Sequence, residues 1–217
     1  MKLVKKTANT PKPQSGDLQP DKQSALILVH LQNDFFPGGS LSVQNGDHIL
    51  PQVNQYIGYF QHQQAAIMAT RDWHPSNHCS FQEAGGPWAP HCVQGSRGAQ
   101  FHANLHLPTG SLIISGATNP KKDIHSGFDG TSLADYLEDR NAKTVYIVGL
   151  ATEHWIKQTV LDGIKLALRV VVLEDAICGV NLKPDDSEQA LQEMATACAI
   201  RASAKDLGLE QIAIISS

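Results

Sequence analysis

The feature that most constrains the fold is a series of short apolar runs that recur along the chain. Continuous apolar runs of this length are typical of strands that are buried on both faces of a parallel sheet. They occupy residues 25–31, 65–70, 111–116, 144–150, 169–175 and 212–216. The segments between them carry apolar residues three and four positions apart, which predicts helices at 47–63, 131–141, 154–168 and 185–200.

Strands that alternate with helices predict an α/β fold. We expect a doubly wound, six-stranded parallel sheet with helices on both faces, joined by right-handed crossovers. The length of 217 residues suits one domain with a sizeable core. Residues 1–23 are rich in Pro, Lys and Gln, and we expect them to form a flexible tail. Residues 24–217 are then a single domain.

Composition excludes several classes of partner. The net charge of −4 gives no reason to expect a nucleic acid or an anionic membrane. No apolar run approaches the ~20 residues that span a bilayer, and the four cysteines form no CxxC pair. These features predict a cytoplasmic protein whose cysteines stay reduced.

Metal-binding side chains follow the second predicted strand. Asp72 and His74 are two residues apart, so in extended backbone both side chains point to one side. His78 follows four residues later, and His91 lies on a separate loop. One carboxylate with two or three imidazoles suits a divalent ion such as zinc, manganese or iron. The alternative is that these are ordinary surface loops, because the chain has ten histidines and some clustering is expected.

Three other strands deliver residues to the same edge of the sheet. Ligands of doubly wound sheets bind beyond the carboxyl ends of the strands. His30, Ser115 and Trp155 follow or end the first, third and fourth predicted strands. Trp155 lies in "LATEHWI", a turn from a strand into a helix, where a nucleophilic Ser or Cys would be exposed. An indole ring cannot act as that nucleophile.

Five stretches of the chain resemble the nicotinamidases and pyrazinamidases of the isochorismatase-like cysteine hydrolases. They are "LILVHLQNDFFPGGSL", "MATRDWHPSNHCSF", "PWAPHCVQGSRGAQFH", "HSGFDGTSLADYL" and "VYIVGLATEHWIKQTVLDG". The resemblance covers nearly everything from about residue 25 to 180 in the family's order. It implies the six-stranded fold and a homo-oligomer. It also implies metal ligands at Asp72, His74 and His91, and at His78 as in some members only; zinc is the expected ion.

The resemblance fails at the catalytic residues. The family hydrolyses an amide with an aspartate that moves a proton, a lysine and a nucleophilic cysteine. Here these positions hold His30, Ser115 and Trp155. Cys92 is an unlikely substitute, because it matches a position that is common in active relatives. Loss of a nucleophile can cost about 10⁶ in turnover, so we expect cysteine amidase chemistry to be absent.

Other parts of the family's pocket are kept. Phe35 and Trp88 match positions that flank the ring of the substrate, although both could be ordinary buried aromatics. The oxyanion hole of the family is backbone, at Ala151 and at the nucleophile position. Trp155 itself either fills the space or forms a stacking platform for a flat ligand.

Three functional hypotheses follow. The leading one is a catalytically degenerate, metal-binding homologue that binds a small aromatic or carboxylate-bearing ligand. The second is a divergent amide or ester hydrolase that uses His30 with Ser115, or His30 with a metal-bound water. The third is a regulatory or structural subunit.

Overall fold

The computed structural model describes residues 18–210 of the chain and contains one six-stranded sheet, in which every pair of neighbours is parallel. The strand order, β3-β2-β1-β4-β5-β6, is that of a doubly wound fold. The strands are β1 (Ser24–Val29), β2 (Ala66–Asp72), β3 (Leu112–Gly116), β4 (Thr144–Leu150), β5 (Arg169–Cys178) and β6 (Ile200–Ala202).

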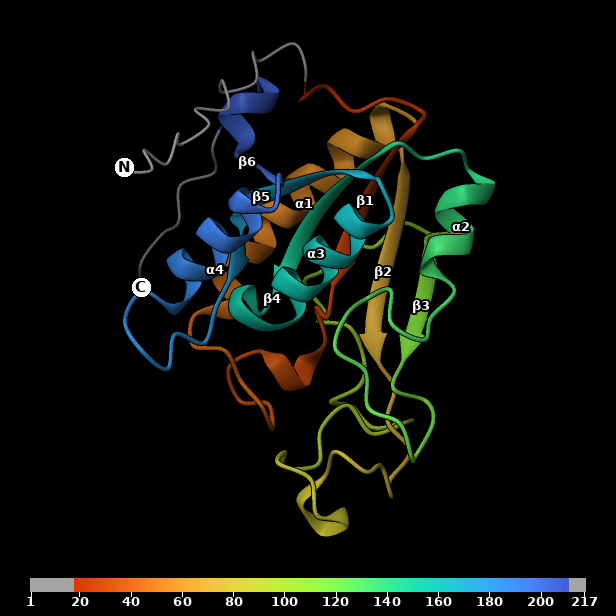
Figure 1. Ribbon diagram of the computed structural model, residues 1–217, viewed down its shortest axis with the longest axis vertical. Coiled ribbons are helices and arrows are strands. Elements are labelled where there is room, and N and C mark those ends of the chain that lie inside the picture. The colour runs from red at the N-terminus through yellow and green to blue at the C-terminus, as the bar shows by residue number, and fades with distance from the viewer. Residues whose placement is uncertain (1–17, 211–217) are drawn as a thin grey trace, which may run out of the picture.

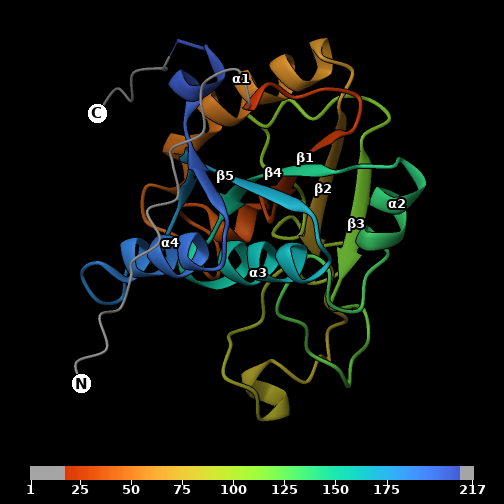
Figure 2. The same ribbon diagram turned by 45° about the horizontal axis from the view of Figure 1, so that its top comes forward.

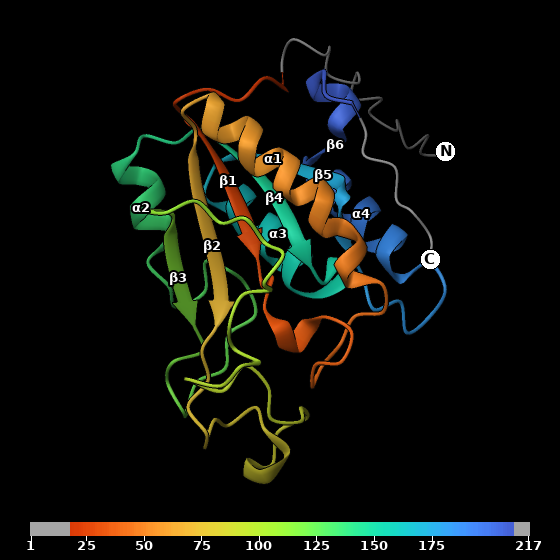
Figure 3. The ribbon, with the colours of Figure 1, turned by 180° about the vertical axis from the view of Figure 1, so that it is seen from behind.

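Helices cover both faces of this sheet, as Figures 1 and 3 show from opposite sides. The longer helices are α1 (Leu50–His62), α2 (Leu133–Asp139), α3 (Lys157–Lys165) and α4 (Asp186–Thr196). Short 3₁₀ helices are η2 (Asn33–Phe35), η3 (Gly46–Ile49), η4 (Gln82–Ala84) and η6 (Ala204–Leu207). The segment η5 (Thr152–Ile156) is a π-helix that leads into α3.

The sheet separates two hydrophobic cores. Val53, Tyr56 and Phe60 of α1 pack on one face, together with alternate residues of the central strands. Helices α2, α3 and α4 pack on the other face, where α3 and α4 lie along the same side of the sheet (Figure 2). β1 is buried at all six positions, because β2 and β4 flank it and helices cover both its faces.

The first five predicted strands are confirmed, and so are the four predicted helices, which end a few residues earlier than expected. The sixth strand of the sheet is Ile200–Ala202, which the sequence pattern did not predict. The run at 212–216 and most of the predicted tail, residues 1–17, lie outside the described residues. Leu18 is buried and its carbonyl accepts a hydrogen bond from Tyr146 Oη, so ordered packing begins before residue 24.

The functional edge of the fold lies beyond the carboxyl ends of the strands. In Figure 1 the long connection between β2 and β3 loops past the arrowheads of both strands. At the same edge Gly149 approaches β1 closely: a Cβ there would lie 2.1 Å from the carbonyl oxygen of Val29. The φ of +124° at Gly149 also requires glycine. Within the described range, no helix is long and apolar enough to cross a bilayer.

Candidate functional site

The structure brings three of the four predicted metal ligands together. One donor atom from each of Asp72, His74 and His91 lies within 4.8 Å of the others, and all three residues are buried. Asp72 ends β2, His74 follows two residues later, and Gln94 N donates to His74 O, which ties the loop that carries His91 to this segment. The strand end and the neighbouring loop therefore build this centre, as the sequence predicted.

Hydrogen bonds to backbone carbonyls orient the two imidazoles. His74 Nδ1 lies 3.1 Å from the carbonyl oxygen of His91, and His91 Nδ1 lies 2.8 Å from that of Ala89. A carbonyl can only accept, so Nδ1 carries the proton in each ring and Nε2 keeps its lone pair. This arrangement is the usual one for histidines that bind a metal through Nε2. His91 Nε2 lies 3.9 Å from Asp72 Oδ2.

His78 lies beside this group but its ring nitrogens have other partners. Nδ1 is 2.8 Å from Ser80 Oγ, and Nε2 is 3.2 Å from the carbonyl oxygen of Lys122. The ring of His78 also contacts that of His74, with centroids 4.5 Å apart. A second set of potential ligands combines His74 and His78 with Asp123. Asp123 did not emerge from the sequence pattern, because it lies on a different connection.

Burial shifts the pKa values of Asp72, His74 and His91. Desolvation raises the pKa of Asp72 well above its usual range, and the charge of Asp123 raises it further. Desolvation and the neighbouring imidazoles lower the pKa of His74 to about 3, and burial also lowers the pKa of His91. The site therefore holds neutral imidazoles at neutral pH, and a negative charge on Asp72 is unfavourable there unless a cation compensates it.

His30 follows β1 and points into this same centre. Its φ of +53° lies in the left-handed region, which non-glycine residues seldom occupy and which is often found at functional sites. The side chain is buried, with Nδ1 3.7 Å from Asp72 Oδ2. Desolvation, followed by the charges of His74 and His91, lowers the pKa of His30 to about 3. An imidazole with so low a pKa is a poor proton acceptor at neutral pH.

Trp155 lies directly against His30. The two ring centroids are 4.1 Å apart, with the planes tilted by 53°. Trp155 belongs to η5, is half-buried, and packs against the core formed with α2, α3 and α4. The ring of Phe35 also stacks with that of His30, with centroids 5.7 Å apart. Three rings thus meet at the end of β1.

Ser115 does not pair with His30. Its Oγ accepts a hydrogen bond from Arg71 Nε at 2.8 Å, and the guanidinium of Arg71 lies over the ring of Trp73. His30 Nδ1 has no hydrogen-bond partner among the described residues. The base–nucleophile pair that we considered from the sequence is therefore not formed, because Ser115 is directed toward the neighbouring strand.

The remaining residues of the predicted pocket lie in different environments. Phe35 also contacts His91, with ring centroids 5.8 Å apart, so it lines the centre. Trp88 is 40% exposed, and only its backbone pairs with neighbouring residues of the loop. Ala151 follows β4, and its carbonyl accepts hydrogen bonds from His154 N and Ile156 N at the start of η5. Cys92 is buried, and desolvation raises the pKa of its thiol, so it is no candidate nucleophile.

Two polar residues that the sequence pattern did not single out as site residues hold this edge together. Gln32 Oε1 accepts from Asp72 N, while its Nε2 donates to the carbonyls of Asp72 and Ala99. Asp34 accepts from Cys92 N and from the backbone and hydroxyl of Ser40. Both appear in the stretch "LQNDF", but their partners include backbone groups of distant residues, namely Asp72, Ala99 and Cys92, which no local pattern reveals.

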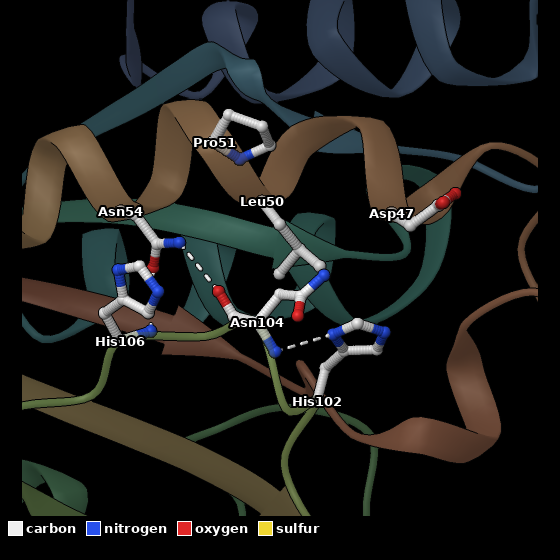
Figure 4. Close-up of a pocket in the computed structure, with 7 residues that line it drawn as sticks. All are labelled: Asp47, Leu50, Pro51, Asn54, His102, Asn104 and His106. Carbon is white, nitrogen blue, oxygen red and sulfur yellow. Dashed lines mark hydrogen bonds between the residues drawn. The ribbon is translucent and has the colours of Figure 1, made fainter. Parts of the chain in front are cut away.

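A separate hollow lies at the start of α1. Figure 4 shows the seven residues that line this cavity of about 570 Å³: Asp47, Leu50, Pro51, Asn54, His102, Asn104 and His106. Asn54 Nδ2 donates to the carbonyl of Asn104, and Asn104 N donates to His102 Nδ1. None of the predicted site residues lines it, so His102 and His106 lie apart from the group of Asp72, His74 and His91.

Comparison with known proteins agrees with the fold and identifies the family. Residues 24–206 match the isochorismatase domain family. The nicotinamidase of Escherichia coli (strain K12) is 39% identical over 194 residues, which are 80% of this chain and 91% of that protein. The nicotinamidase/pyrazinamidase of Mycobacterium tuberculosis (strain ATCC 25618 / H37Rv) is 36% identical over 185 residues, 80% of this chain and 95% of that protein.

Solved structures give the same result. The pyrazinamidase of Pyrococcus horikoshii in complex with zinc superposes with a TM-score of 0.80 at 49% identity and covers 83% of this chain and 99% of that one. PnC1 of L. infantum in complex with nicotinate gives a TM-score of 0.81 at 34% identity, with 89% and 99% covered. The chain belongs to the isochorismatase family and is similar to its nicotinamidases.

Proposed function

We propose that the chain is a metal-binding member of the isochorismatase family that has lost cysteine-dependent amide hydrolysis and binds a small aromatic or carboxylate-bearing ligand. The contact between His30 and Trp155 carries this proposal. The resemblance assigns these two positions to the group that moves the proton and to the nucleophile. Here an indole without a nucleophilic atom packs against an imidazole of low basicity.

The residues of the centre fit a divalent ion. Both carboxylate oxygens of Asp72 are buried and have no hydrogen-bond partner among residues 18–210. Buried polar atoms are nearly always satisfied, and a carboxylate beside the lone pairs of two imidazoles is a ligand set suited to zinc, with manganese and iron as alternatives. The zinc in the structure of the Pyrococcus horikoshii relative supports zinc.

Asp72, His74 and His91 would hold this ion, which would supply a fixed positive charge at the edge of the sheet. The accessible part of Trp155 offers a flat apolar surface next to it, since the ring of Trp155 contacts His30. An aromatic ring that carries a carboxylate complements both features. The nicotinate in the L. infantum relative has this chemistry, which supports it as the first ligand to test.

A metal-dependent hydrolase that uses His30 is the second candidate. The observation that favours it is the 3.7 Å separation between His30 Nδ1 and Asp72 Oδ2, which places the imidazole next to the metal centre. A structural or regulatory subunit is the third reading, and nothing at the site favours it specifically.

The decisive experiment measures ammonia release from nicotinamide and pyrazinamide by the zinc-, manganese- and iron-loaded protein. We expect no release above a boiled control. The triple variant His30→Asp/Ser115→Lys/Trp155→Cys restores the family's residues and is expected to gain activity, which would show that the scaffold remains competent. Release by the wild-type protein that is lost in His30→Ala would establish the hydrolase and contradict our proposal.

Ligand binding is measured on the same preparations. We expect nicotinate to raise the unfolding temperature of the zinc-loaded protein, because a ligand that binds only the folded state stabilises it. If the protein shows neither turnover, nor metal uptake, nor protection by nicotinate, the proposal fails and the chain is a structural or regulatory subunit.

A further inference from the structure

The position of His30 relative to the metal centre supports one step beyond the family's ligand set. We propose that His30 is itself a metal ligand, so that Asp72, His74, His91 and His30 enclose the ion with four protein atoms. This inference rests on the proposed function, because it requires that the centre binds a metal. The histidine at position 30, where the resemblance implies a catalytic aspartate, then adds a metal ligand as well as removing a catalytic group.

The backbone places His30 where a ligand is needed. β1 and β2 are neighbours, with Val29 opposite Thr70, and His30 N donates to the carbonyl of Thr70. His30 and Asp72 thus leave adjacent strands at nearly the same height, and the left-handed φ of His30 turns the chain there. The rings of Phe35 and Trp155 pack against the imidazole and hold it in this orientation.

The distance between His30 and Asp72 is close to that of two ligands of one ion. Two donor atoms that bind one zinc at about 2.0–2.2 Å in tetrahedral geometry lie about 3.3–3.6 Å apart. His30 Nδ1 lies 3.7 Å from Asp72 Oδ2, and His91 Nε2 lies 3.9 Å from the same oxygen. The imidazole of His30 is therefore as close to Asp72 as the imidazole of a residue that the family uses as a ligand. The donor atoms of His30 do not lie within 4.8 Å of those of both Asp72 and either imidazole, so a side-chain rotation has to bring His30 into the group of Asp72, His74 and His91 when the ion binds.

Unpartnered atoms point to the same set. His30 Nδ1, Asp72 Oδ1 and Asp72 Oδ2 are buried without a hydrogen-bond partner in the part of the chain that the structure describes. One cation between them satisfies all three atoms, whereas leaving them unpaired would be costly. His78 is the competing fourth ligand, but Ser80 Oγ and the carbonyl of Lys122 contact its two ring nitrogens. The geometry therefore favours His30 over His78.

Four protein ligands change what the ion does. Zinc sites with four protein donors are structural, whereas catalytic sites keep a position open for water or substrate. Here the ion would join the end of β1, the end of β2 and the loop of His91. A ligand such as nicotinate would then stack on the aromatic rings near the charge without displacing a protein donor.

X-ray absorption of the zinc-loaded full-length protein and the visible spectrum of the cobalt(II) form test this set. We expect the wild-type protein to show three imidazoles at zinc and the intense visible bands of four-coordinate cobalt. His30→Ala should show two imidazoles, and its weaker cobalt bands should regain intensity when free imidazole is added. Because loss of an outer-shell partner alone costs about 10–100-fold in metal affinity, loss of the direct ligand should cost at least about 100-fold.

His102→Ala is the matched control, because the ring of His102 also packs on an aromatic side chain, Phe36, but lines the separate hollow of Figure 4. It should leave both spectra and the affinity unchanged. The inference is overturned if His30→Ala keeps the wild-type spectra, or if His78→Ala alone removes an imidazole. If the wild-type protein takes up neither zinc nor cobalt, the proposed function fails first.

Discussion

Two groups of residues meet at the carboxyl edge of the sheet, and they differ in what holds them. The first group, Asp72, His74 and His91, has the residue types that the resemblance implies for metal ligands, and hydrogen bonds to backbone carbonyls orient its two imidazoles. The second group, His30, Ser115 and Trp155, occupies the positions that the resemblance assigns to the family's catalytic residues. Ring contacts and one hydrogen bond from Arg71 hold it. Our proposal implies that such a site can lose its reacting groups while the neighbouring ligand set keeps its geometry, because different contacts hold the two groups.

Asp72→Ala should have the largest effect on the first group. A ligand present at 1,000 times its dissociation constant adds about 4.1 kcal/mol to the free energy of unfolding. We expect zinc to provide this increment to the wild-type protein and to provide none to the variant. Thermal unfolding with and without zinc, together with the bound metal content, measures it.

Asp123→Ala is the companion variant. Asp123 belongs to the second set of potential ligands, with His74 and His78, and is half-buried. We expect it to retain zinc and most of the increment. If the zinc increment disappears in Asp123→Ala and persists in Asp72→Ala, the ion is in the other set and the comparison above is wrong.

Gln32→Leu tests what supports the first group. Gln32 makes three buried hydrogen bonds to backbone groups, and a buried polar group left unsatisfied costs about 1–3 kcal/mol. We expect a loss of about 3 kcal/mol in the free energy of unfolding, measured by urea denaturation, together with weaker zinc binding. Gln94→Leu is the control, since Gln94 makes a single bond to the carbonyl of Trp73 near the surface. Equal losses in the two variants would contradict this role.

Trp155→Ala tests the second group. Truncation of a fully buried Trp costs about 3–5 kcal/mol, and Trp155 is half-buried, so we expect about 2 kcal/mol. Nicotinate should bind up to about tenfold more weakly, because aromatic pairs contribute about 0.5–1.5 kcal/mol beyond burial. Isothermal titration measures this. Trp73→Ala, whose ring packs on Arg71, should leave the affinity unchanged, and tighter binding to Trp155→Ala would mean that the indole only fills space.

Tyr56→Phe is a control variant outside both groups of residues. Tyr56 Oη donates to Asp175 Oδ1 at 2.7 Å on the face that α1 covers. Loss of this bond should cost about 1 kcal/mol and leave the zinc increment unchanged. A smaller zinc increment in this variant would show that zinc binding depends on the α1 face. That result would contradict our view that the contacts of the first group alone hold the ligand set.

The sequence predicted most of the fold because continuous apolar runs and helical periodicity are strong signals. It missed β6, since Ile200–Ala202 has three residues and contains Arg201, which is too little for a pattern. It placed Asp72, His74 and His91 correctly at one edge, because parallel strands end together. The pairing of Ser115 with Arg71, and the packing of Trp155 on His30, depend on side-chain directions that spacing does not encode. The carbonyl of Lys122 that contacts His78, and the backbone groups of Asp72 and Ala99 that bind Gln32, lie far away in the sequence.

The role of Gln32 has a consequence for how this edge tolerates change. One carboxamide holds the peptide groups of Asp72 and the carbonyl of Ala99, so three segments stay fastened whatever side chain stands at position 30. The hydrogen bonds that hold this edge of the sheet therefore do not involve the side chains of His30, Ser115 or Trp155. Substitutions at these three positions can abolish amide hydrolysis without unfolding the edge of the sheet. A chain of this kind can then acquire a new site at the same edge.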